Sequence, residues 1–166
     1  ATGSLDMVQD MAFESITDFV EGGQYADKAN VQAYSQKFIY YLDPNCSEDS
    51  PMHDENLRKA VFSAIDQDGL ITALGGAYSR LYAYANDYYS DYDMVDWAGL
   101  DNYNSKTSVN ADTVKQYLDA SEYNGETMTL MVMSTFADTA TIIAAQLAAY
   151  GINVELLQVV NATANA

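Results

Sequence analysis

The sequence contains a single histidine, His53, and a single cysteine, Cys46. Both residue types can serve in catalysis or bind a metal ion. No serine in a G-x-S-x-G setting is present to act as a nucleophile beside the histidine. Cys46 has no basic neighbour in the sequence that would activate its thiol. A zinc site usually needs three or four His or Cys ligands. The sequence therefore predicts an exposed loop histidine, no metal site and no cofactor.

A pair of carboxylates could carry out acid–base chemistry, and Asp66 and Asp68 are near enough in sequence to form one. Among 24 acidic residues, however, many such pairs arise by chance. Aspartate is also a preferred residue at the start of a helix. The pattern favours helix caps and leaves a small carboxylate-dependent hydrolase open as an alternative.

Two glycine pairs, Gly22-Gly23 and Gly75-Gly76, could suggest loops that bind phosphate. Each pair is expected to follow a helix, so that the negative end of the helix dipole would face a ligand there. We therefore interpret both pairs as helix C-caps.

Binding residues are better supported where an apolar stretch meets a helix. Ser134, Thr135 and Phe136 follow Thr127–Met133, at the carboxyl end of an expected strand, where open α/β sheets bind ligands. The N-terminal amides of the next helix would suit a carboxylate or carbonyl oxygen. Upstream, residues 77–104 are rich in tyrosine, whose rings offer amphipathic surface. These tyrosines could contact a ligand or pack internally.

The composition limits the possible partners. The 166 residues fit one folded domain with a modest core, and 24 acidic against 7 basic residues give a net charge of −17. A field of that sign repels nucleic acid and anionic lipid, and could favour cationic ligands. No apolar run approaches a membrane span, and no leader opens the sequence, so a leader would lie outside it.

The elements that must position these residues begin with a short helix through Phe13 and Val20, ending at Gly22-Gly23. Residues 31–42 alternate like a strand. Residues 43–54 contain both prolines and are the expected boundary between structural units.

A helix with a buried face is expected from Asp54, its predicted cap, onward. Asp66-Gln67-Asp68-Gly69 should interrupt it, and Asp66 or Asp68 could cap a second short helix carrying Leu70, Ile71 and Leu74. Gly75-Gly76 should end that second helix. Residues 77–104 then form a long ordered loop with one or two helical turns. The expected buried face comprises Leu57, Ala60, Val61, Ala64 and Ile65.

The last third predicts a helix capped by Asn110, a turn at Asn124-Gly125, and a strand–helix–strand unit. The first strand, Thr127–Met133, has apolar residues on both of its faces. Both faces should therefore be covered. Ser134 and Thr135 should cap the connecting helix. Gly151 should end it, before a second strand at Asn153–Val160. The expected inner face of this helix comprises Ala140, Ile143, Ala144, Leu147 and Ala148.

Five segments carry a resemblance to a known family. They are TGSLDM at 2–7, FIYYLDPN at 38–45, DENLRKAVFSAIDQDGLI at 54–71, ADTVKQYLDASEYNGETMTL at 111–130 and IIAAQLAAYGINVEL at 142–156. In this order and spacing they resemble the family 5 extracellular solute-binding proteins of ABC transporters, the group that includes oligopeptide- and dipeptide-binding proteins. The resemblance covers most of the chain, although Gln67 stands where the family usually has a basic residue.

The resemblance implies an α/β fold, a periplasmic-binding-protein-like (type II) lobe fragment with a βαβ unit and a mixed sheet flanked by helices. Residues 1–53 would come from the first lobe or hinge, and residues 54–166 from part of the second lobe. The rest of the protein, including the acidic residue that grips a peptide's amino terminus, would lie outside this chain. The ligand-binding residues that it suggests are Tyr78, Ser79, Ser134, Thr135 and Phe136.

The implied function is capture of a peptide or similar small solute outside the membrane for an ABC permease. Such a protein is not an enzyme, uses no cofactor or nucleic acid, and is a cell-surface lipoprotein or a periplasmic protein. The alternatives are an adhesive surface module that uses the tyrosines and, less favoured, the hydrolase. Taken alone, the fragment should bind ligand weakly or not at all, and exposed sheet edges could make it self-associate.

Overall fold

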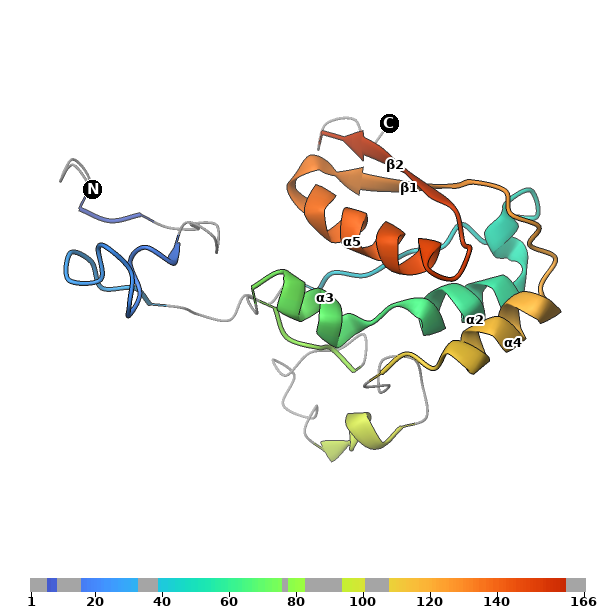
Figure 1. Cartoon of the computed structure of the whole chain (residues 1–166), viewed down its shortest axis with the longest axis horizontal. Helices are drawn as coiled ribbons and strands as arrows, with labels where there is room; N and C mark the ends of the chain where they lie inside the picture. The colour runs from blue at the N-terminus through green and yellow to red at the C-terminus, as the bar shows by residue number, and fades with distance from the viewer. Residues whose placement is uncertain are drawn as a thin grey trace.

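The computed structural model describes residues 6–8, 16–32, 39–75, 78–82, 94–100 and 108–160. Figure 1 shows an α/β body formed from residue 39 onward, with residues 16–32 lying apart from it. The elements are η1 (Pro51–His53), α2 (Glu55–Ala64), α3 (Gln67–Ala73), η3 (Trp97–Gly99), α4 (Ala111–Ala120), β1 (Met128–Met133), η5 (Ser134–Phe136), α5 (Ala137–Ala148) and β2 (Val154–Val159).

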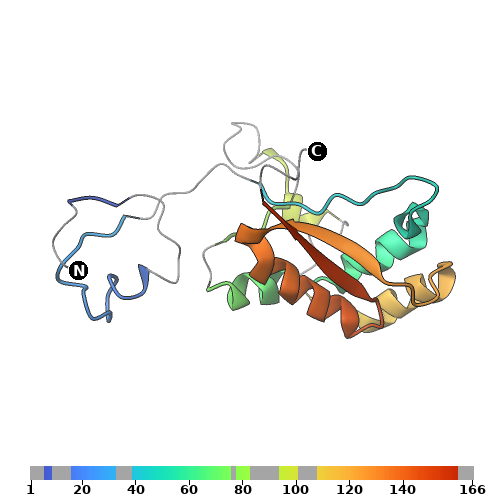
Figure 2. The same cartoon turned by 90° about the horizontal axis from the view of Figure 1, so that it is seen from above.

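The predicted βαβ unit is confirmed. Strands β1 and β2 are parallel and pair from Met128 opposite Val154 to Met133 opposite Val159. Helix α5 connects them and packs on one side of the sheet, as Figure 2 shows from above. Within the described residues this sheet has two strands, both parallel, so the expected mixed sheet is not formed there.

The other face of the sheet differs from the prediction. Thr129, Met131 and Met133 of β1 are exposed, whereas the residues between them are partly buried. The prediction that both faces are covered was wrong, because apolar residues on both sides of a strand indicate hydrophobicity and do not by themselves show what covers them.

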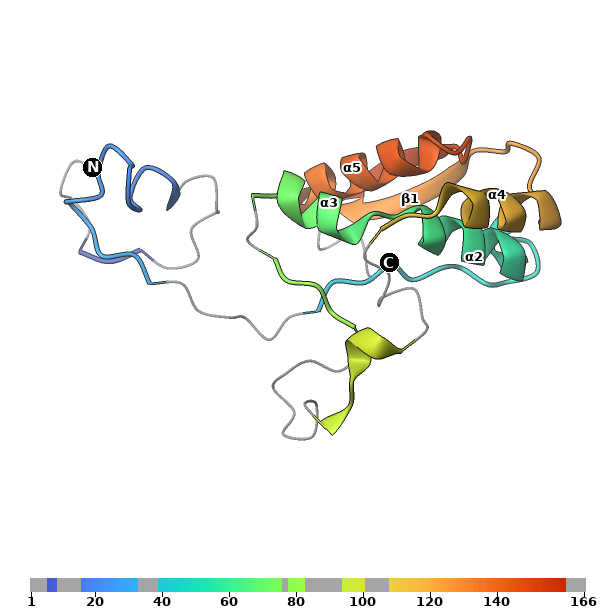
Figure 3. The same ribbon diagram turned by 60° about the horizontal axis from the view of Figure 1, so that its bottom comes forward.

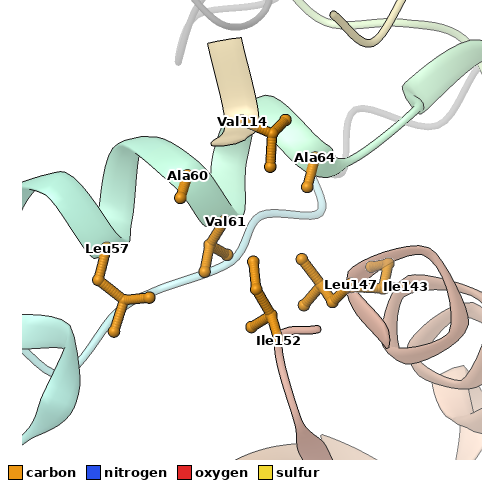
Figure 4. Close-up of a cluster of buried hydrophobic side chains, with 8 residues drawn as sticks. All are labelled: Leu57, Ala60, Val61, Ala64, Val114, Ile143, Leu147 and Ile152. Carbon is orange, nitrogen blue, oxygen red and sulfur yellow. The ribbon is translucent and has the colours of Figure 1, made fainter. Parts of the chain in front are cut away.

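The core lies between α2 and the βαβ unit. The buried face predicted for α2 is confirmed at four of its five positions, and Ile65, which follows the helix, is only partly buried. Figure 4 shows the α2 side chains pointing toward Ile143 and Leu147 of α5 and toward Ile152. The core consists of Leu57, Ala60, Val61, Ala64, Val114, Ile143, Leu147 and Ile152.

The interruption between α2 and α3 is shorter than the sequence suggested. Only Ile65 and Asp66 leave helical conformation, and Gln67, Asp68 and Gly69 already belong to α3. The Asp66 side chain caps α3 by accepting a hydrogen bond from Gly69 N at 2.9 Å. A Cβ at residue 69 would collide with the Asp66 carboxylate, which explains the glycine. The capping prediction for Asp66 is confirmed, and the predicted turn through Gly69 was wrong.

A side chain from α5 stabilises this interruption. Gln146 Oε1 accepts a hydrogen bond from Asp66 N at 3.0 Å, and Gln146 Nε2 donates one to Asp66 O at 3.2 Å. The residues are 80 positions apart in sequence. Gln146 therefore supplies an acceptor for Asp66 N at the helix break. It also adds a second bond to Asp66 O, which already accepts from Leu70 N at 2.9 Å.

Helix α4 lies beside α2, as Figure 3 shows, and Val114 is fully buried. Asn110 caps α4 by accepting from Thr113 N at 3.1 Å, as predicted. Asn56 Nδ2 donates to Ala120 O at 3.0 Å and so joins the start of α2 to the end of α4. Gly125, with φ of +93°, forms the predicted turn before β1.

The predictions for the first part of the chain fare less well. Residues 31–32 and 39–42 are not strand, and residues 33–38 of the predicted strand lie outside the described residues. Phe13 of the predicted helix also lies outside them. Ile16 is helical, as predicted, but Thr17–Phe19 form a turn, with Phe19 N bonded to Ile16 O. Side-chain alternation favoured a strand at 31–42, but a strand also needs a neighbour whose backbone it can pair with.

Between α3 and α4, the described residues agree with two of the predictions for the glycine pair and the tyrosine-rich stretch. Gly75 has φ of +77° and follows α3, as predicted, whereas Gly76 lies outside the described residues. The helical turn η3 agrees with the one or two turns expected in 77–104. Most of the tyrosine-rich stretch, including 83–93 and 101–104, lies outside the described residues.

Candidate functional site

The residues after β1 are arranged differently from the prediction. Ser134 and Thr135 do not cap α5, because they are wound into the turn η5 and the cap position falls on Phe136. The Phe136 side chain cannot accept a hydrogen bond, and α5 has no side-chain cap. Ser134 Oγ instead donates to Val159 O at 3.3 Å, which ties the end of β1 to the end of β2.

Three rings from distant parts of the chain meet beside η5. The Tyr40 ring lies 4.8 Å from the Phe136 ring and 5.8 Å from the Tyr78 ring, measured between centroids, with interplanar angles of 60° and 82°. Such edge-to-face contacts are favourable for aromatic side chains. We call Tyr40, Tyr78 and Phe136 the aromatic cluster.

The aromatic cluster is accessible from solvent. Tyr40 is 55% exposed and Tyr78 is 40% exposed, while Phe136 is partly buried. Aromatic rings that are held by one another and still reach solvent provide a surface on which a flat or apolar group can pack. The cluster can therefore contact a ligand without a conformational change in its own rings.

The cluster unites two of the five residues proposed from the sequence, Tyr78 and Phe136. Ser79 and Thr135 are exposed and adjoin them in sequence, whereas the hydroxyl of Ser134 is directed to β2. Tyr40 was missed. Tyr40 lies in the family-like segment FIYYLDPN, which overlaps the end of the predicted strand. The sequence did not indicate its role because its partners are 38 and 96 positions away along the chain.

The helix N-terminus next to the cluster suits a neutral group better than an anion. Asp138 lies exposed in the first turn of α5, where its negative charge already complements the helix dipole. An incoming carboxylate would meet that charge, whereas a carbonyl oxygen would not.

A charged pair holds the segment that carries Tyr78. Arg80 Nε and Nη2 lie 3.0 and 2.8 Å from Asp68 Oδ1, and the Arg80 guanidinium lies 6.0 Å from the centre of the Tyr82 ring. The Arg80 side chain is 7% exposed, against 51% for Asp68. Asp68 is thus engaged by Arg80, and Asp66 by the cap of α3, so neither carboxylate is arranged as a free acid–base pair.

The remaining candidates for chemistry make local contacts. His53 Nδ1 lies 3.0 Å from Cys46 O, and the Cys46 thiol donates to Pro44 O at 3.4 Å. Both residues are exposed. Among the residues that the structure describes, no three His, Cys, Asp or Glu side chains gather closely enough to hold a metal ion.

Comparison with protein families gives the identity of the chain. The model of the bacterial extracellular solute-binding proteins, family 5 (middle), matches residues 1–166. The chain belongs to this family. No curated protein matches the chain, and no solved structure does.

As a family 5 solute-binding protein, the chain has a solute-binding role in ABC transport and a periplasmic or surface location. Its helices and small parallel sheet agree with a lobe of such a protein. In the part of the chain that the structure describes, no helix has the length and hydrophobicity to cross a membrane.

Proposed function

We propose that this family 5 protein captures peptides or similar small nutrients outside the cell, as a lipid-anchored or periplasmic protein, and delivers them to an ABC permease. Family membership over residues 1–166 is the observation that carries the importer role. Peptide as the ligand is supported by the aromatic cluster, which suits side chains, and by the adjacent helix amides, which suit carbonyl oxygens. Binding would close two lobes around the solute without breaking any bond in it.

We assign residues 1–53 to the first lobe or hinge and residues 54–166 to the second lobe. Two observations support this division. The buried core contains only residues from Leu57 onward, and residues 16–32 lie apart from the α/β body in Figure 1. Residues 39–53 lie against the second part, because Leu42 and Met52 pack on its core. Tyr40 therefore lies in the connection between the two proposed parts, next to Phe136.

Within this proposal the aromatic cluster contacts the solute, and Ser79, Ser134 and Thr135 line its edge. The two exposed rings would pack on an apolar or aromatic side chain. The hydroxyl groups of Ser79 and Thr135 would donate to main-chain carbonyls, which would allow many peptide sequences to bind, whereas the Ser134 hydroxyl is engaged by Val159 O. A protein that imports nutrients benefits from such tolerance.

Calorimetry on the full-length protein tests the proposal. We expect binding of Ala-Phe-Ala and Ala-Ala-Ala, and no binding of glucose or Ni²⁺. Y40A should weaken binding of Ala-Phe-Ala about 2- to 10-fold, since aromatic contacts of this kind contribute about 0.5–1.5 kcal/mol. Y41A is the matched control, because Tyr41 is 65% exposed and lies beside Tyr40 but outside the cluster.

Two results would contradict the proposal. Binding of glucose or Ni²⁺ in the absence of peptide binding would assign the protein to another solute. Peptide cleavage during incubation would favour the carboxylate-dependent hydrolase instead. Equal losses of affinity in Y40A and Y41A would remove the aromatic cluster from the site while leaving the importer role intact.

A further inference from the structure

The segment 78–82 carries a charged side chain that is largely shielded from solvent and is paired with a half-exposed carboxylate. The Arg80 side chain is 7% exposed, and two of its nitrogens lie within 3.0 Å of a single carboxylate oxygen of Asp68. A buried charge is strongly unfavourable unless it is paired and hydrogen-bonded. The pair with Asp68 therefore restricts where Arg80 can lie, and with it the backbone on either side.

Asp68 is itself held in place by contacts that lead back to α5. It lies in the first turn of α3, whose start is fixed by the Asp66 cap. Asp66 is bound through both backbone groups by Gln146 of α5. The carboxylate that Arg80 contacts is thus fixed relative to α5, because a short capped helix and two hydrogen bonds connect them.

The other end of α5 bears the aromatic cluster. Phe136 is the N-cap of α5, Tyr40 contacts Phe136, and Tyr78 contacts Tyr40. Tyr78 precedes Arg80 by two residues and is 40% exposed. The contacts therefore form a closed circuit, from α5 through α3 and Arg80 to Tyr78, and through Tyr40 to α5 again.

We propose that Arg80, through its ion pair with Asp68, is a positioning residue that places the Tyr78 ring against Tyr40 and so completes the aromatic cluster. Without the pair, the segment that carries Tyr78 loses one of the contacts that place it, whereas Tyr40 and Phe136 keep their mutual contact. The consequence for binding rests on the proposed function: the completed cluster selects peptides with an aromatic side chain over those with alanine.

Four variants of the full chain test this role. R80A removes the guanidinium, and D68N removes the charge of its partner while keeping Arg80 and the side-chain shape. R80K keeps the charge but loses the planar group that places two nitrogens against one oxygen. K115A is the matched control, because Lys115 forms an exposed ion pair with Asp119 on α4 and its loss changes the net charge as R80A does.

Fluorine NMR of protein containing 3-fluorotyrosine reports the ring contacts without any ligand. The resonances of Tyr78 and Tyr40 are assigned from Y78F and Y40F. We expect both resonances to move toward that of free 3-fluorotyrosine in R80A and D68N, to move less in R80K, and to stay unchanged in K115A. Should R80A fail to fold, D68N still decides, since it retains Arg80.

The proposal is overturned if the Tyr78 resonance stays in place in both R80A and D68N, or if K115A moves it equally. Calorimetry with the full-length protein adds the functional readout: R80A should weaken binding of Ala-Phe-Ala about 2- to 10-fold and leave Ala-Ala-Ala unchanged. Wild-type protein that binds neither peptide would defeat the proposed function, while the fluorine spectra would still determine whether Arg80 positions Tyr78.

Discussion

At the scale of single residues, Asp54 connects the two helices that form one side of the core. One carboxylate oxygen accepts from Asn56 N at 2.7 Å and Leu57 N at 3.3 Å, which caps α2. The other accepts from Glu122 N at 2.6 Å, just beyond α4. A single ionised side chain thus joins the first turn of α2 to a backbone group 68 positions further along the chain than Asp54 itself.

Asp54 should make the stability depend on pH. Partial burial acts to raise its pKa, but the N–H groups of Glu122, Asn56 and Leu57 and the charge of Arg58 outweigh it, so the folded-state pKa of Asp54 lies below the ordinary value of an aspartate. The stabilisation is therefore fully present above the unfolded-state pKa and is lost as pH falls through the folded-state value. In urea unfolding at pH 7, the free energy of unfolding of D54A should be about 1–2 kcal/mol lower than that of the wild type.

The control for this prediction is D54N at the same pH. Asparagine can still cap α2 through its one oxygen but cannot also accept from Glu122, so D54N should lose less stability than D54A. The difference in free energy of unfolding between wild type and D54A should decrease as the pH is lowered from 5 toward 3. A difference that stays constant over that range would show that the charge of Asp54 is not involved.

Local contacts were predictable from the sequence at this scale, and distant ones were not. Asp54, Asp66 and Asn110 each cap a helix within three residues of themselves, so a short pattern is sufficient to identify them. The contact between Tyr40 and Phe136 joins residues 96 positions apart, and a local sequence pattern cannot predict such a contact. The bond from Asp54 to Glu122 was beyond prediction for the same reason.

At the scale of elements, the orientation of α3 relative to α5 depends on Gln146. Its amide makes two hydrogen bonds to the backbone of Asp66, at a position that is partly buried. The two family-like segments at 54–71 and 142–156 are therefore joined physically at this point. The sequence placed both helices correctly but gave no indication that a polar side chain connects them.

Replacing Gln146 should loosen α3 selectively. Q146A leaves Asp66 N without the acceptor that Gln146 supplies and removes one of the two bonds to Asp66 O, which still accepts from Leu70 N. This loss should destabilise the chain by about 1–3 kcal/mol. Hydrogen exchange should accelerate at Gly69 N and Leu70 N in α3 more than at Val114 N in α4. Q116A, at an exposed position of α4, is the control and should change neither measurement. Uniform acceleration throughout α3 and α4 would contradict a local role for Gln146.

At the scale of the whole molecule, two features have opposite effects on self-association. The net charge of −17 repels other copies of the chain. The open face of the sheet nevertheless exposes Met131 by 56% and Leu157, its partner in register, by 50%. Exposed apolar sheet surface favours association, and we expect the charge to oppose it most strongly at low salt.

Salt should therefore promote self-association of the chain. Raising NaCl from 20 to 500 mM shortens the Debye length from about 20 to about 4 Å and removes the repulsion. Light scattering should show a larger mass at high salt for wild type, and less increase for the double variant M131Q/L157Q. The control M94Q/L100Q changes two exposed apolar residues outside the sheet. A mass that stays constant with salt would contradict the prediction.

The packing of α4 against α2 also has a consequence for the variety of sequences that this fold can accept. It brings together two helices whose connection, from Ile65 to Asn110, includes the tyrosine-rich stretch. When packing holds the two ends of a connection together, doubling its length costs only about 0.6 kcal/mol in loop-closure entropy. Changes in the length of this connection should therefore leave the packing of α2 against α4 in place.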